Sequence, residues 1–356
     1  MARVKKPVAN TIPIIPIPPQ AKVPVKFTKK FNPGHYFVIS EKKGAPDSAL
    51  YSNANEKCNI GGLKGIQVKI DWSDLETKEN VYDFSKIDKL LDVVSKHTDK
   101  HLSIEIADRS FWGGGLGAAP VPKYILDKNW MFVAKVGDQP TAIGKSMPHL
   151  DIDAFADRYI NLLSLIGEKY NKEARLQRVV LIGETSIGIP KDGSGFNYKS
   201  YINNLIRICK ETSQSFDQTI TSIGLNYLKG GNKTYLNVIE NGLFPYGGSI
   251  AWPDALVAEK DKQHLGQVWA MNNKNIIPVT PDADNTMLKY DEVKNTSDIP
   301  RVFDYYVNEF NVHQIYWQPI YATKGFLEKA LLPTLEKNNW AINTKVPSNI
   351  IVKKQT

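Results

Sequence analysis

The sequence predicts an α/β protein built as a single (β/α)8 TIM barrel with a proline-rich extended arm at its N-terminus. The chain has 356 residues, which suits one barrel of about 250–300 residues with short appendages. From residue 35 onward, short β-rich apolar runs alternate with amphipathic helical stretches, as expected for parallel strands joined by helices. Eight such units can be counted along the chain, and eight units close a barrel of this kind.

The predicted strands are short runs rich in β-branched and aromatic residues. Their ranges are 35–40, 65–71, 101–108, 178–184, 221–228, 247–252, 275–282 and 313–321. Helical spacing is clear in 83–97, where Ile87, Leu90 and Val94 fall on one face and Asp83 or Ser85 can cap the start. Further helices with the same spacing are predicted in 151–170, 198–211, 298–310 and 325–337.

The barrel is expected to span 31–345, between an arm at 1–30 and a tail at 346–356. Prolines in the arm forbid helix and favour extended structure. The arm is either a flexible linker or an apolar anchor that docks on a partner subunit. The long excursion after the third strand, which contains 111–127, is expected to form a functional loop over the barrel mouth.

The composition restricts the classes of partner and compartment. A net charge of +8 would suit an acidic polymer or an anionic surface, but the lysines are scattered and no nucleic-acid motif accompanies them. Cys58 and Cys209 lack metal-ligand spacing, so we expect reduced cysteines, no metal and no cofactor. Prolines interrupt the first apolar stretch, so we expect no signal peptide and no membrane span, and a cytoplasmic protein or a component of a virion or surface assembly.

Polar and aromatic side chains follow the predicted strands, where a (β/α)8 barrel carries its site. Glu184 follows the apolar run 179–182 and Gly183, and partial desolvation there would suit an acid catalyst. A second carboxylate would come from Asp282, Asp254 or Asp284, in that order of preference, or from none of them. Paired carboxylates at one mouth are typical of glycosidic bond cleavage, in which one protonates the leaving oxygen and the other attacks or activates water.

The remaining candidates would bind a sugar. Flat aromatic rings pack on the C–H faces of sugars, and amide groups bind the hydroxyls. The aromatic candidates are Trp72, Trp112, Trp252, Trp317 and Tyr227, and the amide candidates are Asn226 and Gln318. Arg109 could hold the carboxylate of an acidic sugar, or it could pair internally with Asp108, Glu105 or Glu184.

The segment 65–94 resembles the second βα unit of retaining (β/α)8 glycoside hydrolases of the large superfamily that includes β-galactosidases and cellulases. The resemblance rests on Trp72, Glu76 and the run Tyr82, Asp83, Phe84 and Ile87, of which the run is expected to be structural. It implies that Glu184 is the acid/base residue and that Trp317 forms the floor of the sugar site.

Two positions depart from the pattern of this superfamily. Gly183 stands where an Asn usually precedes the acid/base residue, and strand seven offers Asp282 or Asp284 in place of a nucleophilic Glu. A shorter aspartate would widen the gap between the carboxylates and favour an inverting mechanism. The alternative is a catalytically inactive barrel that binds glycan as a structural or adhesion subunit, for example of a virion.

Overall fold

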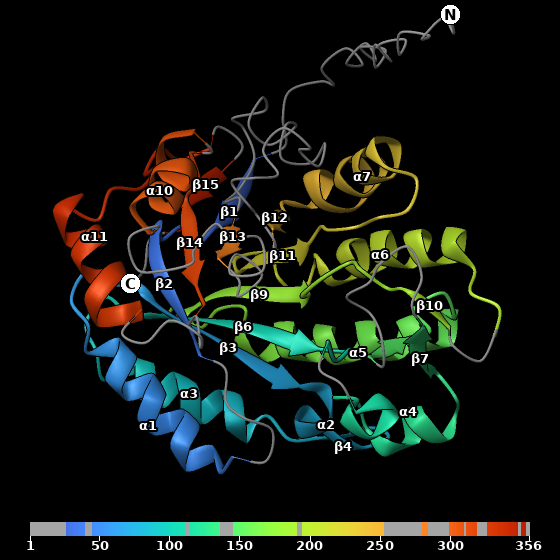
Figure 1. The fold of residues 1–356 in the computed structure, drawn as a ribbon. Coiled ribbons are helices and arrows are strands. Elements are labelled where there is room, and N and C mark those ends of the chain that lie inside the picture. The colour runs from blue at the N-terminus through green and yellow to red at the C-terminus, as the bar shows by residue number, and fades with distance from the viewer. Residues whose placement is uncertain are drawn as a thin grey trace, which may run out of the picture.

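The computed structural model describes residues 26–39, 45–111, 114–135, 145–190, 194–252, 280–283, 299–309, 311–318, 326–347 and 350–353. Within these residues, eight parallel strands close into a barrel whose strand order follows the chain (Figure 1). The strands are β2 (Gly34–Ile39), β3 (Gly65–Asp71), β6 (His101–Ala107), β9 (Leu176–Ile182), β11 (Ile220–Gly224), β12 (Ser249–Trp252), β13 (Thr280–Ala283) and β14 (Gln314–Trp317). Each of the eight predicted strand ranges overlaps one of them.

Helices surround the barrel on its outside (Figure 1). They are α1 (Asp47–Cys58), α3 (Ser85–Ser95), α5 (Asp153–Tyr170), α6 (Tyr198–Thr212), α7 (Asn232–Val238) with the short turns η3 (Ile239–Leu243) and η4 (Phe244–Tyr246), α10 (Ile299–Asp304) with η7 (Tyr305–Glu309), and η8 (Phe326–Leu331) with α11 (Leu332–Lys337). In α3 the predicted apolar face is buried, and α6 begins where the Asn197 side chain accepts a hydrogen bond from the backbone of Ser200 at 3.1 Å. The five helices predicted from apolar periodicity are present, whereas α1 and α7 were not predicted.

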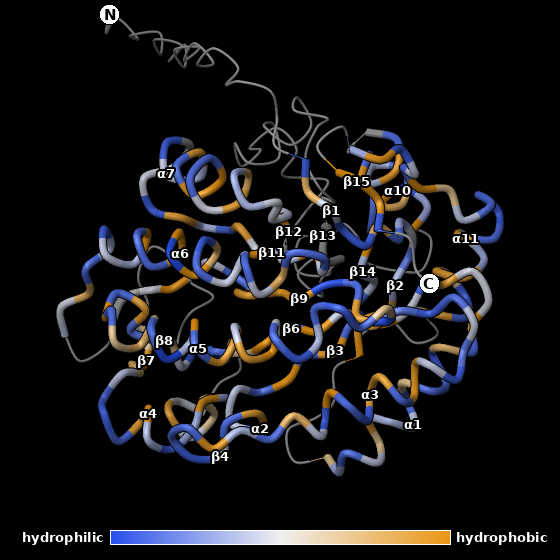
Figure 2. Tube along the Cα trace, turned by 180° about the vertical axis from the view of Figure 1, so that it is seen from behind, coloured by the Kyte–Doolittle hydropathy of each residue, from blue (hydrophilic) through white to orange (hydrophobic). Residues whose placement is uncertain are grey.

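The two faces of the barrel strands differ in chemistry. In β3, Ile66, Val68 and Ile70 are buried in the main hydrophobic core with residues of the surrounding helices, and the alternate positions Gln67 and Lys69 are polar. Figure 2 shows the same strands as predominantly hydrophobic segments at the centre of the molecule. Because strand residues alternate between faces, the polar positions face the inside of the barrel.

Polar and aromatic groups fill the lower part of the barrel interior. The fully buried Arg178 donates to Gln67 at 2.6 Å and to Ser103 at 3.2 Å, and its guanidinium lies 3.8 Å from the ring centroid of Tyr316. Tyr316 in turn stacks on Tyr36. Many barrels fill this space with branched aliphatic side chains, so this interior is unusually polar.

The long excursion after β6 has its own secondary structure. It contains η1 (Gly115–Ala118), α4 (Lys123–Asp127), β7 (Met131–Lys135) and β8 (Ser146–Pro148), and β7 and β8 form a small antiparallel sheet with β10 (Ile189–Pro190). Phe132 and Met147 anchor this sheet in the core. The excursion is thus a packed subdomain in its described part.

The end of the arm and the tail meet in the structure. β1 (Phe27–Lys29) pairs in parallel with β15 (Ile350–Val352), a contact that the sequence did not predict. The buried ammonium groups of Lys29 and Lys30 donate to backbone carbonyls of Phe216 and Asn171, at 2.7 and 2.9 Å, close to the ends of α6 and α5. No helix in the described part of the chain is long and apolar enough to cross a bilayer.

Candidate active site

Glu184 lies just beyond β9, at the carboxyl end of the fourth barrel strand. The pairing of β9 with β11 shifts register between Ser222 and Ile223, close to the point where the chain leaves the strand. Such irregularities re-aim side chains next to sites. Glu184 is partly exposed as a residue, whereas the neighbouring Asn226 is buried.

Asn226 fixes the position of Glu184. Its Nδ2 donates to Glu184 Oε2 at 2.7 Å, and its Oδ1 accepts from the Ser186 backbone at 3.0 Å. Thr185 holds the same loop through two hydrogen bonds with the Asn226 backbone, at 2.7 and 2.9 Å. Asn226 is only 1% exposed and orients the carboxylate, and its binding of a sugar hydroxyl stays a prediction.

Lys69 and Glu105 lie on neighbouring strands beside this loop. The two residues are directly opposite in the register of β3 and β6, and Lys69 Nζ lies 3.2 Å from Glu105 Oε1. Gln67 donates to the other carboxylate oxygen at 3.4 Å. The Lys69 side chain is 39% exposed and that of Glu105 13%, so the pair is open to solvent on one side.

Gly183 brings Glu105 close to Glu184. A Cβ atom at position 183 would lie 2.4 Å from Glu105 Oε1, so the carboxylate occupies the space where a side chain would project. The structure thus explains the glycine that precedes Glu184. Glu105 lies against the backbone of the residue next to the candidate acid.

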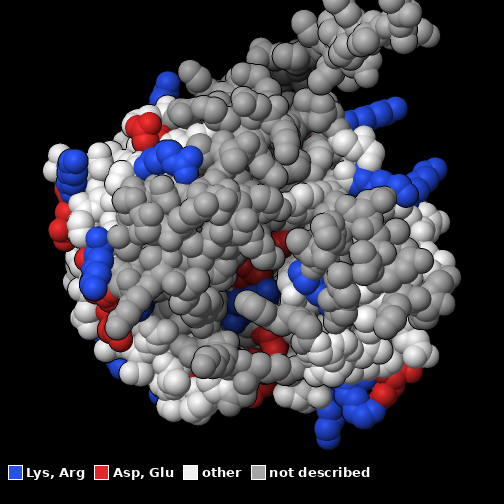
Figure 3. Space-filling model, in the orientation of Figure 1, with Lys and Arg blue, Asp and Glu red and all other residues white. Residues whose placement is uncertain are grey.

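This part of the barrel mouth is locally acidic, although the chain as a whole is basic. Although partial burial opposes it, the carboxylates of Glu105, Glu184 and Asp71 raise the pKa of Lys69. The negative charges of three carboxylates thus act on one ammonium group here, while the whole chain carries +8. In Figure 3, acidic and basic side chains lie together in a central hollow of the face drawn.

Two predicted sugar platforms are core residues. Trp72 is fully buried against Phe155 and Tyr159, and its Nε1 donates to Glu76 Oε2 at 2.8 Å. Trp317 is fully buried as well and donates from Nε1 to Nδ1 of His35 at 3.1 Å. Both rings belong to the main core, so the prediction that they contact a sugar is wrong. For Trp317 the reason is strand parity, since Tyr316, and not Trp317, faces the barrel interior. Trp72 lies in α2 (Trp72–Leu75), beyond the end of β3, and packs on α5.

The acidic-sugar site predicted at Arg109 is also absent. Arg109 forms a bidentate pair with Asp108, at 2.7 and 2.8 Å, and donates to the Ser186 carbonyl at 3.1 Å. Both side chains are 2% exposed. The internal ion pair is therefore the correct reading, because a guanidinium held in this way cannot reach a ligand in the mouth.

Of the other candidates, the structure describes only Tyr227 and Gln318 with their side chains. Trp112, Asp254 and Asp284 lie outside the described residues, and Trp252 and Asp282 are described in their backbone, where Asp282 pairs with Tyr316. Gln318 follows β14 and is half-buried. Tyr227 has a φ of 46°, a left-handed conformation that is costly for a bulky residue.

Sequence reasoning missed Lys69 and Glu105 as members of the site. The signal was present, since each is a charged residue inside an apolar strand, two positions before its end. With alternation, that position places a side chain in the upper layer of the barrel interior.

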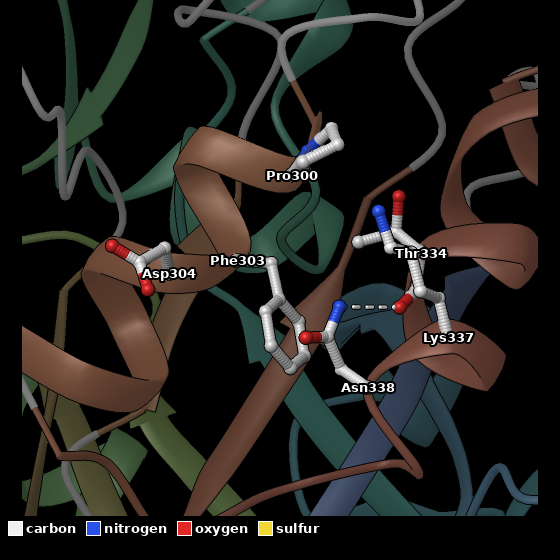
Figure 4. A pocket seen from close by; sticks show the side chains of 6 residues that line it. All are labelled: Pro300, Phe303, Asp304, Thr334, Lys337 and Asn338. Atoms are coloured by element: carbon white, nitrogen blue, oxygen red, sulfur yellow. Dashed lines mark hydrogen bonds between the residues drawn. The ribbon is translucent and has the colours of Figure 1, made fainter.

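One described pocket lies elsewhere. It has a volume of about 170 Å³ and is lined by residues of α10 and α11, including Phe303, Asp304 and Lys337, on the outside of the barrel (Figure 4). Among the described residues, no group of three or more His, Cys, Asp or Glu could hold a metal ion. The candidate site therefore remains the barrel mouth.

No protein-family model matches the chain, and no curated protein matches it in sequence. Solved glycoside hydrolases do share its fold. The catalytic domain of β-amylase from Paenibacillus polymyxa aligns with a TM-score of 0.55 at 11% identity, over 88% of this chain and 98% of that one. Endo-glycoceramidase II from Rhodococcus sp. aligns with a TM-score of 0.50 at 14% identity, over 83% of this chain and 75% of that one. At such identities the likeness shows a common barrel fold.

Proposed function

We propose that this chain is a glycoside hydrolase that cleaves an oligosaccharide or polysaccharide, with Glu184 as the proton donor. The observation that carries the proposal is the placement of Glu184: a half-buried carboxylate at the end of the fourth barrel strand, oriented by the buried Asn226. Active sites of (β/α)8 barrels lie at this end of the strands. The shared fold with solved glycoside hydrolases supports the same reaction class.

In the proposed reaction, Glu184 gives its proton to the glycosidic oxygen as the bond from that oxygen to the anomeric carbon breaks. A second carboxylate either bonds to the anomeric carbon or takes a proton from the water that does so. We propose Asp282 for this role, because it belongs to barrel strand β13, with Asp254 and Asp284 as the other candidates. Trp112, Trp252, Tyr227 and Gln318 remain the proposed sugar contacts.

The test is incubation of the purified chain with a panel of neutral and charged polysaccharides, with release of sugar as the readout. Wild type is compared with Glu184→Gln and Asp282→Asn, and with Glu79→Gln as a control. Glu79 is an exposed surface partner of Lys128, so its loss leaves the mouth intact. We expect wild type and Glu79→Gln to release sugar, and the first two variants to lose at least about 100-fold in rate. Binding without release by every variant would instead support an inactive glycan-binding barrel.

A further inference from the structure

The Lys69–Glu105 pair offers a hydrogen-bond donor and an acceptor side by side at the barrel mouth. The two groups lie 3.2 Å apart and are directly opposite across β3 and β6. An ammonium group has three donors and a carboxylate can accept about four hydrogen bonds. Each group therefore keeps capacity beyond their mutual contact, and the partial exposure of both leaves it reachable.

The pair is held firmly from below. Gln67 donates to Glu105 at 3.4 Å, and the same Gln67 accepts from the buried Arg178 at 2.6 Å. Arg178 is in turn fixed by Ser103 and the Tyr316 ring. This column of polar contacts inside the barrel orients the Glu105 carboxylate before any ligand arrives.

The pair also lies next to the bond that Glu184 would protonate. Glu105 lies against Gly183, the residue before Glu184, and Lys69 pairs with Glu105 at 3.2 Å. A sugar whose glycosidic oxygen is at Glu184 places its own ring hydroxyls only a few atoms away. Those hydroxyls are the groups that would meet Lys69 and Glu105.

We propose, resting on the function proposed above, that Lys69 and Glu105 bind two neighbouring hydroxyl groups of the sugar ring on which Glu184 acts. One hydroxyl accepts from the Lys69 ammonium and the other donates to the Glu105 carboxylate, so the pair selects an uncharged vicinal diol. An acidic sugar is disfavoured at this position, because its carboxylate would approach that of Glu105, which already pairs with Lys69, and that of Glu184, which follows the glycine that Glu105 lies against. The basic net charge of the chain therefore does not set the specificity of the reacting ring.

The experiment uses Glu105→Gln and Lys69→Met, with Lys86→Met as a matched control. Lys86 also pairs with carboxylates, those of Asp47 and Asp74, but on the outer helix α3. The substrates are a neutral glycoside that wild type cleaves and a series of its monodeoxy analogues, each lacking one hydroxyl of the reacting ring. The readouts are kcat/KM and, by calorimetry, the dissociation constant of a neutral oligosaccharide.

We expect Glu105→Gln and Lys69→Met each to lose about 10- to 100-fold in kcat/KM on the intact sugar, as for a lost charge-assisted hydrogen bond. On the analogue that lacks the matching hydroxyl, variant and wild type should be equal. If both variants behave like Lys86→Met on an intact substrate that wild type cleaves, the pair is structural and the proposal is wrong, while the hydrolase function stands.

The binding measurement separates the remaining outcomes. Wild type could bind a neutral glycan without cleaving it. If both variants then bind that glycan 10-fold or more weakly, the diol site is supported and hydrolysis is refuted. Absence of both binding and cleavage in wild type would overturn the two proposals together. Tighter binding of an acidic oligosaccharide than of its neutral counterpart would contradict the selectivity for an uncharged ring.

Discussion

Two regions of the molecule each have a glutamate at their centre. One is the barrel mouth, and the other is a corner formed by α2 (Trp72–Leu75), β4 (Glu76–Lys78) and β5 (Val81–Tyr82). In the corner, Glu76 is fully buried and accepts from Trp72 at 2.8 Å, Tyr124 at 3.0 Å, the Asn80 backbone at 2.9 Å, and Arg158. At the mouth, Glu184 is half-buried, beside a lysine and two further carboxylates. A carboxylate enclosed by donors stabilises the fold, whereas one that stays open to solvent can transfer a proton.

The largest effect on stability is expected at the corner, where replacing Glu76 tests whether this buried carboxylate stabilises the fold. Glu76→Gln should destabilise the protein by about 3 kcal/mol, because it leaves Arg158 without its charge partner and turns one acceptor into a donor. Chemical denaturation measures this difference, with Glu79→Gln on the neighbouring exposed turn as a control expected to change stability by less than about 0.5 kcal/mol. Activity per folded molecule should be retained. A stability change no larger than that of the control would mean that the corner is not the structural hub described.

Three buried histidines make the free energy of unfolding depend on pH. Burial lowers the pKa of His35, His101 and His313 to about 4 from the ordinary 6.5, so all three are neutral in the fold. Their contribution is complete above pH 6.5 and is lost as the pH falls from 6.5 towards 4, because the unfolded chain then binds more protons. Together they should cost about 2 kcal/mol of unfolding free energy between pH 7 and pH 6. Unfolding curves at these two pH values check this, and a stability that is constant or rises on acidification would contradict it.

At the mouth, Gly183→Ala should act on Glu105. The new methyl group would meet Glu105 Oε1, so the carboxylate must move away from Lys69. We expect about a ten-fold loss of kcat/KM, equal to about 1.4 kcal/mol, with little loss of stability. In a Glu105→Ala background the same substitution should have no further effect. Additive losses in the double variant would show that the two positions act independently.

The smallest effect is expected at Trp72. Trp72→Phe keeps an aromatic ring against Phe155 and Tyr159 but removes the indole donor to Glu76, which should cost about 1 kcal/mol. Substrate affinity should not change, since the ring lies in the core. A higher KM without loss of stability would show that Trp72 contacts the sugar.

The barrel was predictable because its signals are local. Each of the eight strands is a short apolar run of β-rich residues, and α3, α5 and α6 have regular apolar spacing. These patterns depend on neighbours in the chain and not on the final packing.

The site was predictable only in part, because the direction in which a side chain at a strand end points depends on packing. Glu184 lies at the mouth as expected, but Trp72 and Trp317 turn to the helix layer and Arg109 closes on Asp108. A residue at the end of a strand can face either side, and only the alternation along that strand decides between them. The same alternation would have revealed Lys69 and Glu105. The pairing of β1 with β15 joins residues near the two ends of the chain, which no local pattern predicts.

The most direct test of the account is whether Glu184 donates the proton. Glu184→Gln is compared with wild type on a natural glycan and on a dinitrophenyl glycoside of the same sugar, whose leaving group departs without protonation. If Glu184 is the proton donor, the variant loses about 1000-fold on the glycan and less than about ten-fold on the dinitrophenyl glycoside. Equal losses on both substrates, or no loss on either, would contradict it.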